Sequence, residues 1–149
     1  MAHPDNDIRD VLWQLAFQFK LSTKAAIADD NLPLNGMHVR LLRLIRTQPD
    51  CTANQLANLT RRDKAQITRV LKELDGMGLI QRAPHPDDKR SQIISLSAPG
   101  RALMRKAEHA QEKVKATLLK GLSQTEIDAF LATARRMIDN LDREQGGQS

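Results

Sequence analysis

The sequence predicts a mainly α-helical fold, in which a winged helix-turn-helix lobe with a two-stranded β-wing lies between long N- and C-terminal dimerisation helices. Three observations within residues 52–100 predict it. Two short helical patterns follow one another, glycines end the second pattern, and a turn with basic residues separates two apolar strands. This order of elements is that of a winged helix-turn-helix.

Two helices are predicted before this segment. Apolar residues repeat at four-three-four spacing from Ile8 to Phe19, which predicts a helix over about residues 5–29 with one apolar stripe. Asn35 has a side chain that suits an N-cap, so a second helix is expected to begin there and to end before Pro49.

The third and fourth helices each begin at a capping residue. Thr52 and Gln55 match a capping box, in which the hydroxyl accepts from a backbone N–H and the amide side chain reaches back. Asp63 is the predicted cap of the fourth helix. The apolar residues of that helix share one face, which is expected to be buried, and they are Ile67, Val70, Leu71 and Leu74.

The predicted wing comes next. Gly76 and Gly78 end the fourth helix, and strands are expected from Leu79 onward and over residues 92–96. A two-stranded ribbon alone is marginally stable, so the wing must lean on the helices. The turn between the strands is expected to hold Pro84, Pro86, Asp87 and Asp88.

Two further helices follow the wing. Ser97 with Pro99 opens a long helix, and Gly121 stops it. The last helix begins at a second capping box, residues 123–126, and carries a heptad-like apolar stripe. The polar tail from Arg143 is expected to fray.

The long terminal helices predict a homodimer. Their apolar stripes are separated by the compact middle of the chain, so the same helices of a second copy would cover them best. The predicted organisation is a single domain over residues 1–149, with a helical dimerisation region in 5–30 and 98–142 and a winged helix-turn-helix DNA-binding lobe in 36–97.

Composition narrows the class of protein. A net charge of +5 and a pI near 9.7 favour contact with phosphate or acidic surfaces, although a solvated basic surface fits the same numbers. The lone Cys51 cannot form an intramolecular disulfide and suits a reducing compartment. No segment approaches the ~18 to 20 unbroken apolar residues of a membrane span, and the acidic N-terminus, with Asp5, Asp7 and Asp10, is unlike a signal peptide. We therefore expect a cytoplasmic protein that does not contact a membrane.

A polar stripe on the fourth helix lies opposite its apolar face. Gln66 can pair bidentately with adenine and Arg69 with guanine, while the small Ala65 lets the backbone approach a major groove. Thr68 and Lys72 are predicted to anchor phosphates, and Lys64 is a further candidate base reader. A solvated charged helix face would show the same pattern. The residues predicted to contact DNA on this helix are Lys64, Ala65, Gln66, Thr68, Arg69 and Lys72.

The turn before the fourth helix adds positive charge. Arg61 and Arg62 lie where a phosphate backbone would run, next to the positive end of the helix dipole. Residues 60–92 hold eight Lys or Arg against five Asp or Glu, a net of +3. The two arginines are predicted phosphate anchors.

The wing tip carries a second predicted contact. Lys89 and Arg90 project together from a turn stiffened by proline, and an arginine there can enter a narrow minor groove. Ser91 is a predicted phosphate anchor. Asp88 is expected to hold the shape of the turn by pairing with Arg90 or Arg62. An ordinary charged hairpin tip fits the same residues.

With these motifs, the chain resembles the MarR family (multiple antibiotic resistance regulators). The likeness is carried in family order and spacing by NQLANL (54–59), RDKAQITRVLKELDGMGLIQR (62–82) and HPDDKRSQIISLSAPG (85–100). The family's wing usually reads Asp-x-x-Asp-x-Arg, and here His85 stands at the first acidic position while Asp88 and Arg90 keep the others. The resemblance implies a mainly helical homodimer carrying two winged lobes. It also implies a bacterial repressor released from DNA by a small aromatic or anionic effector or by thiol oxidation.

Other chemistry finds little support in the sequence. Cys51 has no partner for a redox switch within one chain and lies away from the reactive cysteine positions of redox-sensing family members. No metal-ligand spacing, phosphate loop or catalytic triad is present, so we expect neither a metal, a cofactor nor an enzyme.

An effector site is predicted between the first and second helices. An apolar cleft with one titratable donor would suit an aromatic carboxylate, although aromatic residues at helical spacing are more often core. The residues of this candidate site are Trp13, Phe17, Met37, His38 and Leu41.

The predicted function is a homodimeric, sequence-specific regulator that binds double-stranded DNA at a pseudo-palindromic operator, as a ligand-responsive repressor. Two alternatives remain open. A winged helix can serve as a protein-interaction module without reading sequence, or it can bind DNA without sequence preference as an architectural protein.

Overall fold

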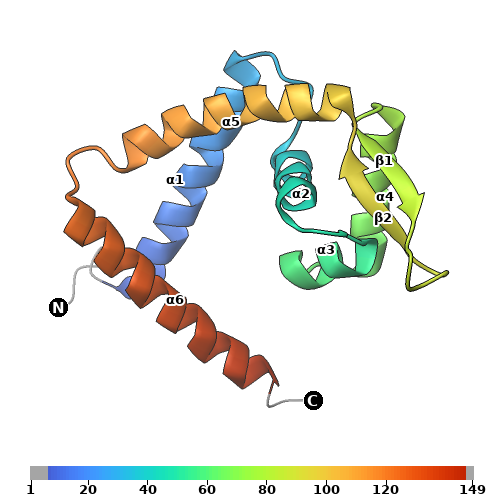
Figure 1. The fold of residues 1–149 in the computed structure, drawn as a ribbon. Helices are drawn as coiled ribbons and strands as arrows, with labels where there is room; N and C mark the ends of the chain where they lie inside the picture. The colour runs from blue at the N-terminus through green and yellow to red at the C-terminus, as the bar shows by residue number, and fades with distance from the viewer. Residues whose placement is uncertain (1–6, 147–149) are drawn as a thin grey trace. The chain divides into compact units, whose positions relative to one another are not determined.

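The computed structural model describes residues 7–146 (Figure 1). Its elements, in chain order, are α1 (Ile8–Asp29), α2 (Gly36–Thr47), α3 (Ala53–Thr60), α4 (Lys64–Gly76), β1 (Ile80–Pro84), β2 (Gln92–Leu96), α5 (Ala98–Leu118) and α6 (Gln124–Gly146). The chain divides into two compact units, one up to Val114 and one from Lys115 onward. The predicted mainly helical winged fold is confirmed.

The predicted helix caps are present as hydrogen bonds. The Asn35 side chain accepts from the backbone N–H of His38 at 2.8 Å, and the other predicted caps behave in the same way. Of the two predicted capping boxes, at Thr52 and Ser123, the one at Ser123 is closed in both directions, because Glu126 also accepts from the Ser123 backbone N–H. The remaining cap bonds are Gln55 N to Thr52 Oγ1 at 3.2 Å and Gln66 N to Asp63 Oδ1 at 3.0 Å.

The start of the first helix differs slightly from the prediction. We expected it near Asp5, which lies outside the described residues, and α1 begins at Ile8. Asp7 is its N-cap, accepting from the Arg9 backbone N–H at 2.8 Å. A carboxylate at this position satisfies a backbone N–H that has no partner within the helix.

Two other boundaries also differ. The tail from Arg143 was expected to fray, but α6 continues to Gly146, and the rest of the tail, residues 147–149, lies outside the described residues. A cation in the last turn is favourable beside the negative end of the helix dipole, which helps that turn to persist. Pro84 was expected in the turn, but it is the last residue of β1, paired with Gln92. A two-stranded sheet has only edge strands, where a proline without an N–H is tolerated.

The hydrophobic core of the first unit is formed by side chains of the winged helix-turn-helix lobe and of α5. Leu41 and Leu42 of α2, Leu56 of α3 and Leu74 of α4 have no exposed surface. The wing adds the buried side chains of one face, including Ile94, and α5 covers the cluster with Met104 and Ala107. The hairpin therefore does lean on the helices, as a marginal ribbon must.

A backbone hydrogen bond and a serine side chain fix the wing to its neighbours. The Ile94 N–H donates to the Cys51 carbonyl at 2.7 Å, so the segment before α3 pairs with β2. The Ser97 hydroxyl donates to the Gly78 carbonyl at 2.6 Å and accepts from the Gly100 N–H at 3.1 Å. The start of α5 is thereby pressed against the chain that enters β1.

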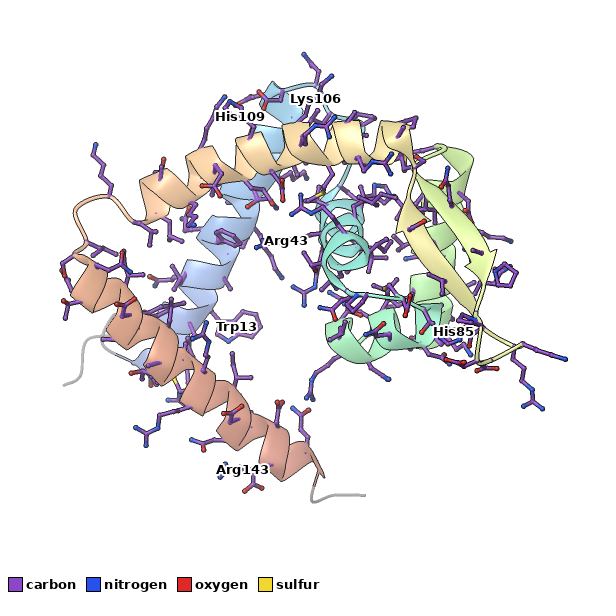
Figure 2. All side chains as sticks on the ribbon, viewed as in Figure 1. Trp13, Arg43, His85, Lys106, His109 and Arg143 are labelled. Carbon is purple, nitrogen blue, oxygen red and sulfur yellow. The ribbon has the colours of Figure 1, made fainter. Side chains whose placement is uncertain are left out.

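The terminal helices leave apolar side chains uncovered. Ile27 is the only buried residue of α1, and Trp13 and Phe17 are 77% and 61% exposed. α6 buries none of its described residues, and its Leu141 is 64% exposed. Figure 2 shows Trp13 projecting from α1. An apolar stripe of this size is a candidate interaction surface.

Replacing Gly100 with Ala should lower the free energy of unfolding by about 1 to 3 kcal/mol, the usual cost of overpacking. An added Cβ would lie 2.0 Å from the Leu79 carbonyl oxygen, so backbone must move. Gly76→Ala is the matched control, because a Cβ there meets nothing within 4 Å. Urea unfolding should place only the Gly100 variant below wild type, and equal midpoints for all three proteins would contradict the close packing.

Cys51 should be unreactive in the folded protein. Its side chain is 1% exposed, and burial raises the pKa of the thiol to about 11. At pH 8 only about one thiol in a thousand would then be the reactive thiolate. Because the folded pKa is raised, the folded state should also lose stability as the pH rises from about 9 toward 11. Ellman's reagent should modify the thiol only after denaturant is added, and rapid labelling of the folded protein would contradict its burial.

Candidate nucleic-acid interface

The fourth helix has one buried and one exposed side. Ile67 and Leu71 are 1% exposed, and Val70 and Leu74 are also buried, as the apolar spacing predicted. The opposite side is solvent-exposed at every predicted contact position, which are Lys64, Ala65, Gln66, Thr68, Arg69 and Lys72. Burial of the apolar face thus settles which side chains the helix can offer to a partner.

The turn between α3 and α4 is compact and basic. Arg61 adopts a left-handed backbone conformation, with φ of 54°, and the Arg62 N–H donates to the Ala57 carbonyl at 3.2 Å. Both arginine side chains are exposed. The turn therefore holds two cations next to the positive end of α4.

The Thr68 hydroxyl is engaged within its own helix. It donates to the Lys64 carbonyl at 2.8 Å, a bond that threonine often makes in helices. Its oxygen can still accept, but to donate to a phosphate it would have to give up this bond. The spacing of residues along the helix could not show that the Thr68 hydroxyl is already bonded.

The wing turn is held by Asp88, but with different partners from those expected. Asp88 accepts from the Arg90 backbone N–H at 2.9 Å and from the Ser91 hydroxyl at 3.1 Å. These bonds lower the pKa of its carboxyl group, first through the Arg90 backbone and then through Ser91. Within residues 7–146, Asp88 pairs with no guanidinium. The prediction of a side-chain pair with Arg90 or Arg62 was therefore wrong. Aspartate in a turn commonly accepts from the backbone N–H two residues along the chain, which here is that of Arg90.

His85 replaces the first acid of the family's wing pattern and also shapes the turn. The ring Nδ1 accepts from the Asp87 backbone N–H at 3.1 Å, while the backbone N–H of His85 donates to the Ser91 carbonyl at 3.3 Å. Figure 2 shows His85 on the wing. Lys89 and Arg90 are exposed at the tip, and Ser91 is half-buried. An imidazole acceptor thus does locally what a carboxylate acceptor could do.

Most acids near this surface are engaged. Of the five acids between residues 60 and 92, four accept hydrogen bonds. Because these four carboxylates are held by partners, their positions next to the exposed cations of α4 and the wing are fixed. The bonds join Asp63 to the first turn of α4, Glu73 to His38, Asp75 to Arg82, and Asp88 to the wing turn.

Two of these ties were not predicted from the sequence. Arg82 of β1 donates to Asp75 of α4 through both Nε and Nη2, at 3.1 and 2.9 Å. His38 Nε2 lies 2.6 Å from Glu73 Oε2. Asp75 and Arg82 carry opposite charges on either side of the glycines that end α4, and this could have suggested the first of the two interactions. The second joins residues 35 positions apart and has no local signal.

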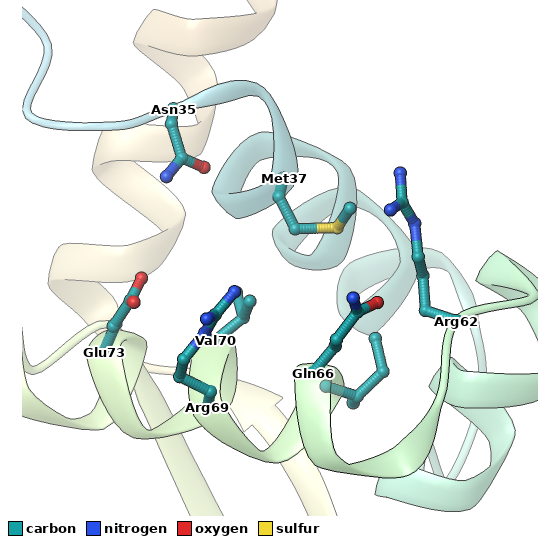
Figure 3. Close-up of a pocket in the computed structure, with 8 residues that line it drawn as sticks. Asn35, Met37, Arg62, Gln66, Arg69, Val70 and Glu73 are labelled. Atoms are coloured by element: carbon teal, nitrogen blue, oxygen red, sulfur yellow. The ribbon is translucent and has the colours of Figure 1, made fainter.

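A cleft lies along α4 where it faces the start of α2 (Figure 3). Asn35, the N-cap of α2, and Met37 of α2 line one side, and the side chains of Gln66, Arg69 and Glu73 rise from α4 toward them. Arg62 closes one end. The cleft brings Met37, a predicted effector contact, beside predicted DNA contacts.

The predicted effector residues lie in different surroundings. Met37 lines this cleft, whereas Trp13 and Phe17 are exposed on α1 and are absent from its lining. Leu41 has no exposed surface, and both ring nitrogens of His38 already have hydrogen-bond partners. The effector site stays a prediction.

Residues 7–146 show neither a membrane-spanning helix nor a metal site. No helix there is long and apolar enough to span a membrane. The same residues contain no group of three or more His, Cys, Asp or Glu side chains that could hold a metal ion.

Known proteins share this architecture. The model of the MarR family matches residues 34–92. An uncharacterized HTH-type transcriptional regulator from Mycobacterium bovis is 28% identical over 123 residues, covering 83% of this chain and 86% of that protein. The crystal structure of a probable transcriptional regulator from Pseudomonas aeruginosa is 30% identical, with a TM-score of 0.73 over 91% of this chain and 99% of that one.

A further solved structure concerns regulation of DNA binding of Bordetella bronchiseptica BpsR by 6-hydroxynicotinic acid. BpsR is 22% identical, with a TM-score of 0.80 over 93% of this chain and 98% of that one, and it supports the fold. The family model matches the lobe that carries the candidate interface, and the P. aeruginosa regulator is matched along almost its whole length. We conclude that the chain belongs to the MarR family of transcription regulators.

Proposed function

We propose that the protein is a sequence-specific regulator that binds double-stranded DNA as a homodimer, with α4 in the major groove. The observation that carries the proposal is the division of α4 into a buried apolar side and an exposed side with Gln66, Arg69 and Lys72. These side chains are the donors that read or anchor DNA. A docking module would more often expose apolar residues at this place.

The contacts divide by chemistry. Gln66 and Arg69, with Lys64 in the first turn, are the proposed base readers, and Ala65 leaves room for the backbone to approach. The proposed wing contacts are Lys89 and Arg90, in the minor groove. The proposed phosphate anchors are Arg61, Arg62, Thr68, Lys72 and Ser91.

The proposed dimer would place two reading helices on successive major grooves. The exposed apolar residues of α1 and α6 give it a surface, so the dimerisation region would comprise residues 5–30 and 98–142 and the DNA-binding lobe 36–97. Two-fold symmetry would then call for a pseudo-palindromic site with half-sites about one helical turn, ~34 Å, apart. We propose that the protein acts in the bacterial cytoplasm and is not an enzyme, as its relatives named transcriptional regulators suggest.

A salt titration tests the proposal against the docking alternative. The purified chain should bind random duplex DNA at low salt and release it by about 200 mM, because phosphate contacts displace condensed counterions. Absence of binding at every salt concentration would favour a docking module. Tight binding without preference among sequences would favour an architectural protein.

Replacing Arg69 with Ala should cost about 1 to 3 kcal/mol on the preferred duplex and relax sequence preference, because a bidentate base contact is lost. Replacing Lys72 with Ala should instead weaken all duplexes alike and lower the salt slope by about one. Fluorescence anisotropy on preferred and shuffled duplexes measures both effects. A uniform loss for both variants would contradict the division into reader and anchor.

We further propose that an aromatic acid modulates DNA binding, since BpsR is regulated by 6-hydroxynicotinic acid. Trp13 is the only tryptophan of the chain, and it is 77% exposed. Adding 6-hydroxynicotinic acid should quench Trp13 emission and release bound duplex over the same concentration range. Quenching without release, or release unchanged in a Trp13→Phe, Phe17→Leu double variant, would contradict an effector site at these residues.

A further inference from the structure

His38 occupies a position where both of its ring nitrogens are used. It is the third residue of α2, and its side chain is buried beside the start of that helix. Nδ1 accepts from the Asn35 backbone N–H at 3.1 Å, and Asn35 Oδ1 accepts from the His38 N–H at 2.8 Å. On the other side of the ring, Nε2 lies 2.6 Å from Glu73 Oε2 of α4.

These two hydrogen-bond partners assign the tautomer of the His38 ring. Nδ1 can accept from Asn35 only while it carries no proton, so the proton is on Nε2 and is donated to the Glu73 carboxylate. Glutamate, the commoner residue at this place in a capping box, could accept from Asn35 but could not donate to Glu73. The histidine therefore serves α2 and α4 at once.

Glu73 also has a cation within reach along its own helix. Arg69 precedes it by four residues, a spacing at which opposite charges on a helix can pair. Figure 3 shows both side chains rising from α4 into the same cleft. Within the described chain, the Arg69 side chain makes no hydrogen bond or ion pair, while the Glu73 carboxylate is bonded to His38.

We propose that His38 is a positioning residue for DNA reading: by holding the Glu73 carboxylate against α2, it keeps Arg69 from pairing along α4 and leaves its guanidinium available to a base. A guanidinium paired with Glu73 would present fewer donors to guanine and would carry a negative charge toward the DNA. This inference rests on the proposed function. It assigns a role in sequence preference to a residue that lies outside the exposed side of α4.

A double-mutant cycle between His38 and Arg69 tests it. His38→Glu keeps an acceptor for the Asn35 cap but removes the donor to Glu73, so Glu73 should turn to Arg69. The ratio of affinities for the duplex selected from a random library and for its shuffled form should fall about fivefold or more, the lower range of one lost bidentate contact. In an Arg69→Ala background the same His38→Glu change should leave that ratio unaltered.

His38→Gln is the matched control. Its amide can accept from Asn35 and donate to Glu73, so the affinity ratio should stay within about twofold of wild type. Measurements belong at a temperature where circular dichroism shows every variant fully folded. A rescue variant, His38→Glu combined with Glu73→Gln, should restore the affinity ratio because the carboxylate that competes for Arg69 is gone.

Two results would overturn the positioning role. One is a wild-type affinity ratio in His38→Glu, and the other is an equal loss from His38→Glu with and without Arg69, which indicates a purely structural effect. If the wild-type chain itself bound no duplex, the proposed function would fail first, and that outcome is visible before any variant is made.

Discussion

Burial of the apolar side of α4 is the constraint on which the rest of the lobe depends. Ile67, Val70, Leu71 and Leu74 lose their solvent contact to the core formed with α2, α3, the wing and α5. Each such side chain contributes about 1.5 to 3 kcal/mol when fully buried, so rotating the helix about its axis would be costly. The direction of Gln66, Arg69 and Lys72 toward solvent is a consequence of that burial.

Charge on this surface is arranged by what holds the acids as much as by the number of cations. Glu73 is turned toward α2 by His38, Asp75 is bound by Arg82, and Asp88 closes the wing turn. A count of charges over residues 60–92 gives a net of only +3. These bonds leave the net charge unchanged but fix where the carboxylates lie, so the positions of the acids shape the field at the exposed face together with the count.

Much of the fold could be predicted from the sequence because its signals are local. The caps at Asn35, Thr52, Asp63 and Ser123 each depend on neighbours three residues away, and the structure contains all four. The side of α4 that is buried followed from spacing alone. Long-range pairs were beyond this reasoning: the tie between His38 and Glu73 depends on how α2 crosses α4, and the choice of a backbone N–H by Asp88 depends on the exact turn. The predicted DNA contacts lie on exposed positions, and which of them touch DNA depends on a partner that no pattern within the chain can describe.

On the proposed function, the exposed sides of α4 in two copies of the chain act together on one duplex. Selection of bound fragments from a random duplex library is the decisive experiment. We expect an inverted repeat whose half-sites are centred about one helical turn apart, roughly 10 to 10.5 base pairs. Enrichment of a single unrepeated half-site, or of no sequence at all, would contradict it.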